Sequence, residues 1–160
     1  MATRLLHTMV YDAPADAVAA MLSDASFREE VCTNQRATAF NVKVDGDVTS
    51  KDVRIEMTQP TDRVPSFAKK IVGAETTILQ TEKWSSPTHG DVHITIPGKP
   101  GEMRGTATLV EVDGVTTETV DLQVTVKIPL VGGKVEELIA KLIGSALRAE
   151  ERTGKAWLSR

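Results

Sequence analysis

The sequence lacks several features that would point to particular functions. It holds one cysteine, Cys32, in 160 residues, so an internal disulfide, a cysteine-rich zinc site and a redox pair of thiols are excluded. Aromatic residues make up only 4% of the chain, which favours an aliphatic or flexible ligand over a flat aromatic one. No apolar run approaches the length that spans a bilayer, and the first residues lack the pattern of a signal peptide. These absences predict a soluble, cytoplasmic protein without stable membrane insertion.

The chain also lacks a strong excess of either charge. Its 19 basic and 22 acidic residues are mixed along the sequence and give a formal net charge of -3. This pattern provides no basic stripe for nucleic acid, so we expect no nucleic-acid partner. The hydrophobic share of 41% is enough for one sizeable core in a chain of this length. We therefore expect one domain over residues 1–160.

Motifs for catalysis and cofactor binding are missing as well. No phosphate-binding glycine loop, nucleophile elbow or metalloprotease motif occurs. In an extended segment, His89 and His93 would be separated by about 13 Å, too far for one metal ion, and Asp91 between them leaves a third ligand unidentified. His7 can be a base if it faces inward, or a hydrogen-bonded structural residue, which we favour. Cys32 is expected to be a small buried residue, so we predict no catalytic residue, no metal and no cofactor.

Two short basic stretches are weak candidates for anion binding. Lys69 and Lys70 have too few basic neighbours in the sequence to form a membrane-binding patch. Lys99 and Arg104 lie in "PGKPGEMRG", which fits a polar connection between two strands better than an anion site. Neither stretch predicts a function.

Alternation of apolar and polar residues predicts an antiparallel sheet with one buried face. The expected strands are Thr3–Tyr11, a hairpin within residues 38–58 that turns at Asp45-Gly46, and residues 74–84, 91–97, 103–112 and 116–128. Pro129 ends the last strand because proline has no N–H for the sheet ladder. Residues 60–72 interrupt the alternation, so we expect a loop there, able to cover part of the protein, with a short helix after Pro65.

Helical spacing predicts two short helices after the first strand and one long helix at the end. Pro14 suits the first turn of the first helix, and Ser26 with Glu29 has the spacing of a capping box for the second. The long helix is expected from about Leu130 towards Trp157. Its apolar stripe, which we expect to be buried, consists of Val131, Val135, Leu138, Ile139, Leu142, Ile143 and Ala146.

Two glycines stand at the start of this helix, although glycine costs a helix about 1 kcal/mol relative to alanine. On a helical wheel Gly132 points towards the sheet and Gly133 points outward. Gly132 therefore either lets the helix backbone lie close against the strands or leaves a gap between helix and sheet. Gly133 is expected only to loosen the corner between strand and helix.

The order of one strand, two short helices, six strands and a long helix resembles the START-like, or helix-grip, superfamily, which includes polyketide cyclases and birch-pollen-allergen relatives. The opening "YDAPADAVAAMLSD" looks like the usual start of this superfamily. The segments "FREEVC", "IPGKPG" and "KIPLVGGKVEELI" resemble an uncharacterised actinobacterial family whose function is unassigned. The resemblance implies an α+β fold in which a curved seven-stranded antiparallel sheet wraps the long C-terminal helix. One feature departs from the allergen branch, since "DGDVTSK" holds a single glycine where that branch has a glycine-rich loop.

In helix-grip proteins an apolar ligand commonly sits between the sheet and the C-terminal helix. The resemblance therefore implies binding of a small hydrophobic or amphipathic, lipid-like molecule, and leaves any protein partner open. Each residue expected to line the site could equally belong to an ordinary core. The expected ligand-binding residues are Phe27, Phe40, Ile55, Phe67, Ile78, Ile94, Leu122, Val124, Gly132, Leu138 and Leu142.

Two other functions remain open from the sequence. A cyclase- or dehydratase-type enzyme acting on a polyketide-like substrate would use the same space, and it requires ionisable side chains inside it, such as His7 or a carboxylate. A non-catalytic interaction domain would instead present an exposed apolar patch.

Overall fold

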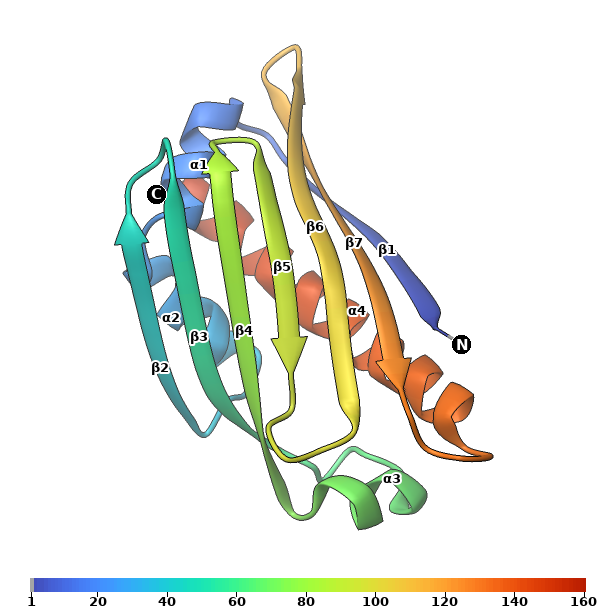
Figure 1. The fold of residues 1–160 in the computed structure, drawn as a ribbon. Coiled ribbons are helices and arrows are strands. Elements are labelled where there is room, and N and C mark those ends of the chain that lie inside the picture. The colour runs from blue at the N-terminus through green and yellow to red at the C-terminus, as the bar shows by residue number, and fades with distance from the viewer. Residues whose placement is uncertain (1) are drawn as a thin grey trace.

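The computed structural model describes residues 2–160, and it shows one antiparallel sheet curved around a long helix (Figure 1). The sheet has seven strands in the order β1-β7-β6-β5-β4-β3-β2. The first strand of the chain, β1, therefore pairs with the last strand, β7. The strands are β1 (Thr3–Tyr11), β2 (Ala39–Gly46), β3 (Lys51–Pro60), β4 (Glu75–Ser86), β5 (His89–Thr95), β6 (Gly101–Val112) and β7 (Val115–Val126). The sheet, its strand number and its curvature confirm the helix-grip prediction.

Four helices accompany the sheet. They are α1 (Ala15–Leu22), α2 (Ala25–Asn34), α3 (Ser66–Val72) and α4 (Gly132–Leu158). The short helix expected after Pro65 is therefore confirmed as α3. The second helix begins differently from the prediction, because the side chain of Asp24 accepts a hydrogen bond from the Ser26 N–H at 2.8 Å. Asp24 is the N-cap, and the capping box predicted at Ser26 is wrong.

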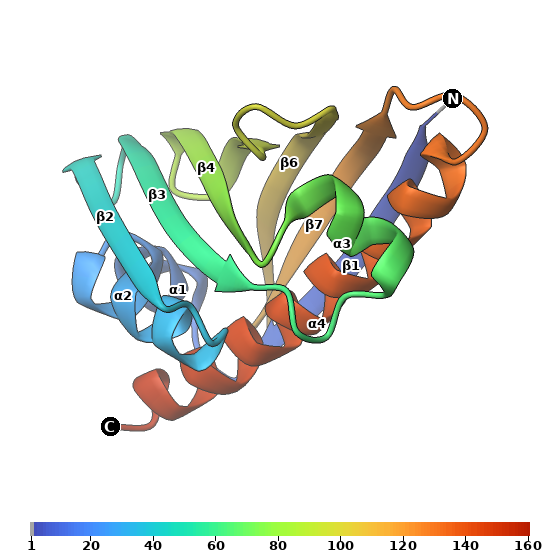
Figure 2. The ribbon, with the colours of Figure 1, turned by 90° about the horizontal axis from the view of Figure 1, so that it is seen from below.

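Helix α4 crosses the concave face of the sheet obliquely (Figure 2). It packs against β1 and β7, while α1 and α2 pack against its C-terminal half. Near its N-terminus, the buried Glu136 carboxylate accepts hydrogen bonds from the Thr3 hydroxyl at 3.0 Å and from the Val126 N–H at 2.9 Å. This carboxylate therefore attaches the first turns of α4 to the ends of β1 and β7. None of the helices in residues 2–160 is both long and apolar enough to cross a bilayer.

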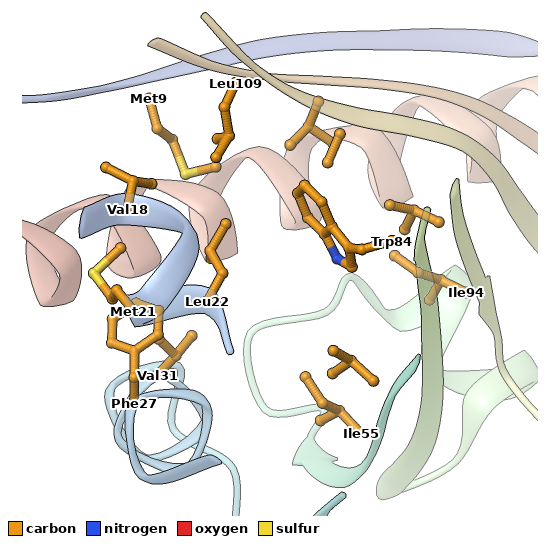
Figure 3. Packing of buried hydrophobic residues seen from close by; sticks show 14 of the residues in the cluster. Met9, Val18, Met21, Leu22, Phe27, Val31, Ile55, Trp84, Ile94 and Leu109 are labelled. Carbon is orange, nitrogen blue, oxygen red and sulfur yellow. The ribbon is translucent and has the colours of Figure 1, made fainter. Parts of the chain in front are cut away.

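The apolar core fills the space where the sheet, α1, α2 and α4 meet. Figure 3 shows Trp84 at its centre, with Ile55 and Ile94 on one side and Leu22 and Met9 on the other. These side chains come from four strands, β1, β3, β4 and β5, and from α1. The core is consequently concentrated at the α1–α2 end of the sheet, and the opposite end carries α3.

The stripe of α4 is only partly buried, which corrects one prediction. Val135 is buried, but Val131 is 37% exposed and Leu142 is 42% exposed. A helical wheel identifies the apolar side of a helix without identifying the element that covers it. The N-terminal half of α4 packs against β1 and β7, and part of its apolar side stays open.

The structure decides between the two explanations for Gly132. Gly132 is buried, and a Cβ atom added to it would lie 2.5 Å from the carbonyl oxygen of Val126. Gly133 has no heavy atom within 4 Å of the corresponding position. Gly132 therefore permits a close approach between the helix and the end of β7, whereas Gly133 points outward as predicted.

This difference predicts opposite effects for two matched substitutions. Gly132→Ala forces a methyl group against a backbone oxygen and should lower the free energy of unfolding by about 1–3 kcal/mol. Gly133→Ala adds a methyl group in open space inside a helix and should raise the same quantity by up to about 1 kcal/mol. Urea denaturation of the two variants beside the wild type measures both values. Equal effects of the two substitutions would show that the close approach at Gly132 does not constrain the fold.

Candidate functional site

The apolar residues expected to line a site separate into two groups in the structure. Five of them lie in the hydrophobic core and are buried, namely Phe27, Ile55, Ile94, Leu122 and Val124. Their side chains pack against one another or against their core neighbours, as the edge-to-face contact between Phe27 and Trp157 at 5.5 Å illustrates. These five residues form the interior wall and contribute mainly to packing.

The second group keeps contact with solvent at the α3 end of the molecule. We call it the open-end apolar surface, and it consists of Phe40, Phe67, Ile78, Leu138 and Leu142. Phe40 is 38% exposed, and Ile78, Phe67 and Leu138 are half-buried. Exposed large apolar side chains are costly in water unless something covers them. The open-end apolar surface is therefore the part of the predicted site that remains available.

Strand register and helix geometry bring these residues together. Phe40 pairs with Met57 and Met57 pairs with Ile78, so the three side chains form one row on the concave face. The Lys134 ammonium lies 4.4 Å from the centre of the Phe67 ring, which places α3 beside the first turns of α4. Because Leu138 and Leu142 follow Lys134 at intervals of four residues, they lie on the side of α4 that faces α3. In Figure 2, α3 lies across α4 between that helix and the edges of β3 and β4.

Gly132 lies apart from this group. It lines a surface pocket of about 420 Å³ at the start of α4, together with Thr3, Ile128 and Leu130. That pocket is on the side of α4 that meets β1 and β7, whereas Leu138 and Leu142 face α3. The structure therefore does not bring Gly132 together with the other predicted lining residues.

The interior contains charged residues that the sequence analysis did not identify. We call them the buried ionic cluster: Arg28 on α2, Lys51 on β3, Glu82 on β4, Glu118 on β7 and Glu150 on α4. All five are buried, and they come from five different elements. The cluster adjoins the apolar core at the α1–α2 end of the sheet.

Arg28 and Glu82 form the best-defined contact of the cluster. The two guanidinium Nη atoms donate to the two carboxylate oxygens at 3.0 and 2.8 Å, and the Arg28 Nε donates to the Leu22 carbonyl at 2.9 Å. Glu82 also accepts from the Trp84 indole N–H at 2.8 Å and from the Gln80 amide at 2.6 Å. Burial opposes ionisation of Glu82, but the Arg28 charge and these hydrogen bonds hold its pKa below the usual value. Arg28 and Glu82 are therefore a fully ionised buried pair.

The other two carboxyl groups of the cluster behave in the opposite way. Burial, and then the Glu150 charge, raise the pKa of Glu118 well above its ordinary value. Burial raises the pKa of Glu150 to about 7, although Arg28 acts to lower it. The Glu118 Oε1 atom is buried without a hydrogen-bond partner. Glu150 can therefore gain or lose a proton near neutral pH, and the proton is held more tightly by Glu118 than by an ordinary glutamate.

Lys51 is the second cation of the cluster. Its ammonium lies 4.7 Å from the centre of the Trp84 ring and has no hydrogen-bond acceptor among the described residues. Burial lowers the pKa of Lys51 to about 8, and the Arg28 charge adds to that effect. Within the buried ionic cluster, the Lys51 ammonium and the Glu118 Oε1 atom are therefore without a hydrogen-bond partner among the described residues.

The sequence contained a partial signal for this cluster. Glu82 has the same strand parity as Ile78 and Trp84, and Glu118 has the same parity as Val120, so a strict alternation places both on the buried face, although we did not predict this from the sequence. Arg28 has no comparable signal, because its partner lies in a strand 54 residues further along the chain.

The single-residue candidates take different places. His7 faces inward on β1, but its Nε2 atom is buried without a hydrogen-bond partner, so the hydrogen bond that we expected there is absent. Cys32 is buried, and burial raises the pKa of its thiol to about 11, as expected for an unreactive cysteine. His89 lies 3.5 Å from Asp91, and His93 lies 3.7 Å from Glu102. Within residues 2–160, no three His, Cys, Asp or Glu side chains gather in a way that could hold a metal ion.

Comparison with known proteins gives the chain its family. The model of one protein family, described as a protein of unknown function (DUF2505), matches residues 6–158. The chain belongs to this DUF2505 family. The uncharacterized protein Rv0481c of Mycobacterium tuberculosis (strain ATCC 25618 / H37Rv) is 25% identical to it over 133 residues, which cover 77% of this chain and 76% of that protein. The predicted resemblance to a family without an assigned function is confirmed.

Solved structures of START-like proteins share the fold of this DUF2505 member. A START superfamily protein from Mycobacterium smegmatis aligns with a TM-score of 0.58 and 16% identity, over 98% of this chain and 97% of that one. The di-domain ARO/CYC protein StfQ from the steffimycin biosynthetic pathway aligns with a TM-score of 0.70 and 10% identity, over 99% of this chain and 52% of that one. At these identities the likeness shows the fold, and the function of the DUF2505 protein must be argued from its own residues.

Proposed function

We propose that this DUF2505 protein binds a small hydrophobic or amphipathic, lipid-like molecule in the cytoplasm, between the concave face of its sheet and α4. The observation that carries the proposal is the open-end apolar surface. Its residues come from β2, β4, α3 and α4, and all of them keep solvent contact. Strand pairing places Phe40 and Ile78 in one row on the concave face, and the Lys134–Phe67 contact places α3 beside α4. A guest that covers them would remove apolar area from water, which is worth about 25 cal/mol for each Å².

The arrangement supports an elongated amphipathic guest. Its apolar part would contact Phe40, Ile78 and Leu142, and its polar end could then point either to solvent or to the unpaired Lys51 ammonium. Aliphatic residues make up most of the surface, which favours a flexible chain. Helix α3 lies beside the first turns of α4 and would cover part of a guest bound there.

Leu142→Asn tests this proposal without disturbing the core, because Leu142 is already 42% exposed. Losing a leucine contact of this kind should weaken binding of a fluorescent fatty acid about tenfold, while the free energy of unfolding changes little. Fluorescence titration of the folded variants provides the dissociation constants.

Leu6→Asn is the matched control. Leu6 is 57% exposed on the convex face of β1, so the same chemical change there should leave fatty-acid binding unaltered. Failure of the wild type to bind any fatty acid, or equal weakening by both substitutions, would contradict the proposed site.

The buried ionic cluster favours a second candidate function. A cyclase- or dehydratase-type enzyme needs ionisable groups inside the fold. Glu118 and Glu150 are buried carboxyl groups whose pKa values are raised, that of Glu150 to about 7. Incubation of the wild type and of Glu118→Gln with a linear poly-β-ketone thioester, followed by mass spectrometry, tests this function. Cyclised or dehydrated products that form faster with the wild type than with the variant would favour the enzyme, and equal product formation would exclude Glu118 from such a reaction.

A further inference from the structure

The end of the molecule that carries α3 collects basic side chains from four separate segments. We call it the basic end, and it consists of Arg63, Lys69, Lys70, Lys99, Lys127 and Lys134. All six side chains are exposed. Lys69 and Lys70 alone were too few to predict a membrane-binding patch, but the fold adds basic residues from the β5–β6 and β7–α4 connections.

Contacts between the segments show that these residues are neighbours. The Lys127 N–H donates to the Pro100 carbonyl at 3.3 Å, so the end of β7 lies beside the loop that holds Lys99. The contact of Lys134 with the Phe67 ring joins the start of α4 to α3, which carries Lys69 and Lys70. Figure 1 shows α3 and both connections at the same end of the sheet.

The charge of the basic end is not neutralised locally. Among residues 2–160, no carboxylate lies within 4.0 Å of the charged groups of these six side chains, whereas Asp62 nearby pairs with Arg36 at 3.6 Å. Glu75 and Glu137 are exposed at the same end and offset only part of the positive charge. The basic end is therefore electropositive, although the whole chain has a net charge of -3.

The opposite end of the molecule is acidic. The turns and helix at that end carry Asp12, Asp16, Asp45, Asp47, Glu111 and Asp113, all exposed. Glu111 accepts a hydrogen bond from the Ala15 N–H at 2.7 Å, which places the β6–β7 hairpin beside α1. The charge distribution is thus polarised along the sheet, and in front of an anionic surface it would turn the basic end towards that surface.

An apolar residue projects from the middle of the basic end. Leu130 is fully exposed, with a relative exposure of 104%, and lies between Lys127 and Lys134 in the chain. Its φ angle of +72° is in the left-handed region, which a leucine rarely adopts. The neighbouring Val131 is 37% exposed. The connection between β7 and α4 therefore exposes an apolar side chain to water, with Lys127 and Lys134 on either side of it in the chain.

We propose that the basic end docks on an anionic lipid bilayer, with Leu130 inserted among the lipid headgroups and the lysines facing the phosphates. A projecting apolar side chain within a ring of cations matches the boundary between acyl chains and anionic headgroups. A soluble acidic partner would neutralise the lysines but would leave the exposed side chain of Leu130 without an apolar contact. This inference goes beyond binding of a guest and needs none, but the open-end apolar surface lies at the same end, so a lipid-like guest could pass between bilayer and protein there.

Co-sedimentation of the wild type with lipid vesicles tests this docking. Vesicles that contain phosphatidylglycerol should bind the protein at low salt, and vesicles of phosphatidylcholine alone should not. Binding should fall as salt is added, because salt screens the lysines from the phosphates. No sedimentation with anionic vesicles at low salt, or equal sedimentation with both lipids, overturns the proposal.

Two variants locate the contact. Leu130→Ser and the double variant Lys69→Glu/Lys70→Glu should each weaken vesicle binding by at least about tenfold, with unchanged circular dichroism. The matched controls are Leu6→Ser and Lys43→Glu/Lys83→Glu, which change exposed residues on other surfaces and should bind like the wild type. Equal losses in variants and controls would overturn the assignment to the basic end. Binding to soluble heparin without binding to vesicles would show that the basic end binds a dissolved polyanion, and it would overturn the proposal of bilayer docking.

These measurements do not depend on the fatty-acid titration. Vesicle docking without fatty-acid binding would support the bilayer inference and contradict the proposed ligand binding. Fatty-acid binding without vesicle docking would support the ligand binding and contradict the bilayer inference.

Discussion

Arg28→Met is expected to lower the free energy of unfolding by about 3–5 kcal/mol, the largest effect among the substitutions considered. Glu82 would then keep its negative charge inside the protein with only neutral donors, the Trp84 indole and the Gln80 amide. Removing one partner of a buried pair leaves the full desolvation cost of the other. Urea denaturation followed by circular dichroism provides the free energies at neutral pH.

Two further variants separate this explanation from a simple loss of packing. Arg28→Met/Glu82→Gln removes both charges and should regain a large part of the lost stability, because no buried charge then lacks a partner. Arg4→Met breaks the exposed contact of Arg4 with Asp121 at 2.8 Å and should leave the free energy of unfolding nearly unchanged, because solvent screens an exposed ion pair. A similar small loss in Arg28→Met would mean that water reaches Glu82 and that the pair does not stabilise the fold.

The fold was predictable because most of its signals are local. Strand alternation as in β7, the prolines around β3 and α3, and the long amphipathic period of α4 each depend on neighbours in the chain. Order along the chain then leaves few topologies for a sheet that must cover one long helix. The start of α2 was placed wrongly since Asp24 and Ser26 are both good caps, and only the backbone shows which one accepts the hydrogen bond.

The buried ionic cluster was not predictable in the same way. Polar residues on strands are expected to face solvent, so Glu82 and Glu118 drew no attention despite their inward parity. Their burial depends on Arg28, which reaches them only because α2 is folded over the end of the sheet. No pattern within a single segment contains that information.

The basic end was missed for a related reason. Lys99, Lys127 and Lys134 are separated in the sequence by stretches of other character, and only the loops at one end of the sheet bring them to Lys69 and Lys70. The exposure of Leu130 depends equally on tertiary structure, since a helical wheel that begins at that residue cannot show that α4 starts later, at Gly132.

The buried carboxyl of Glu150 predicts a stability that falls as the pH rises. Its pKa is raised from 4.5 in the unfolded chain to about 7 in the folded protein, so the folded protein binds this proton more tightly. The stabilisation is fully present below the unfolded pKa and is lost as the pH rises through the folded pKa. Each unit of pKa difference corresponds to about 1.4 kcal/mol, so Glu150 accounts for at most about 3 kcal/mol.

Glu150→Gln should remove this pH dependence, since an amide carries no proton to lose. We expect the variant to match the wild type near pH 5 and to exceed its free energy of unfolding by up to about 3 kcal/mol near pH 7.5. Urea denaturation at a series of pH values in that interval gives the two curves. Arg28 retains Glu82 as its partner in the variant, so the loss of Glu150 does not leave a bare buried cation.

Neighbouring groups determine how this measurement is interpreted. Glu118 acts in the same direction because its pKa is also raised, so part of the slope should survive in Glu150→Gln. Glu82 acts in the opposite direction, since the stability from its lowered pKa is lost as the pH falls. Lys51, with a pKa lowered to about 8, loses stability as the pH falls through that value, mainly above the interval measured. Glu137→Gln is the control, an exposed change on the same helix, and its free energy of unfolding should follow that of the wild type in parallel at every pH. If the free energy of unfolding of Glu150→Gln fell with pH as steeply as that of the wild type, the Glu150 carboxyl would be solvated.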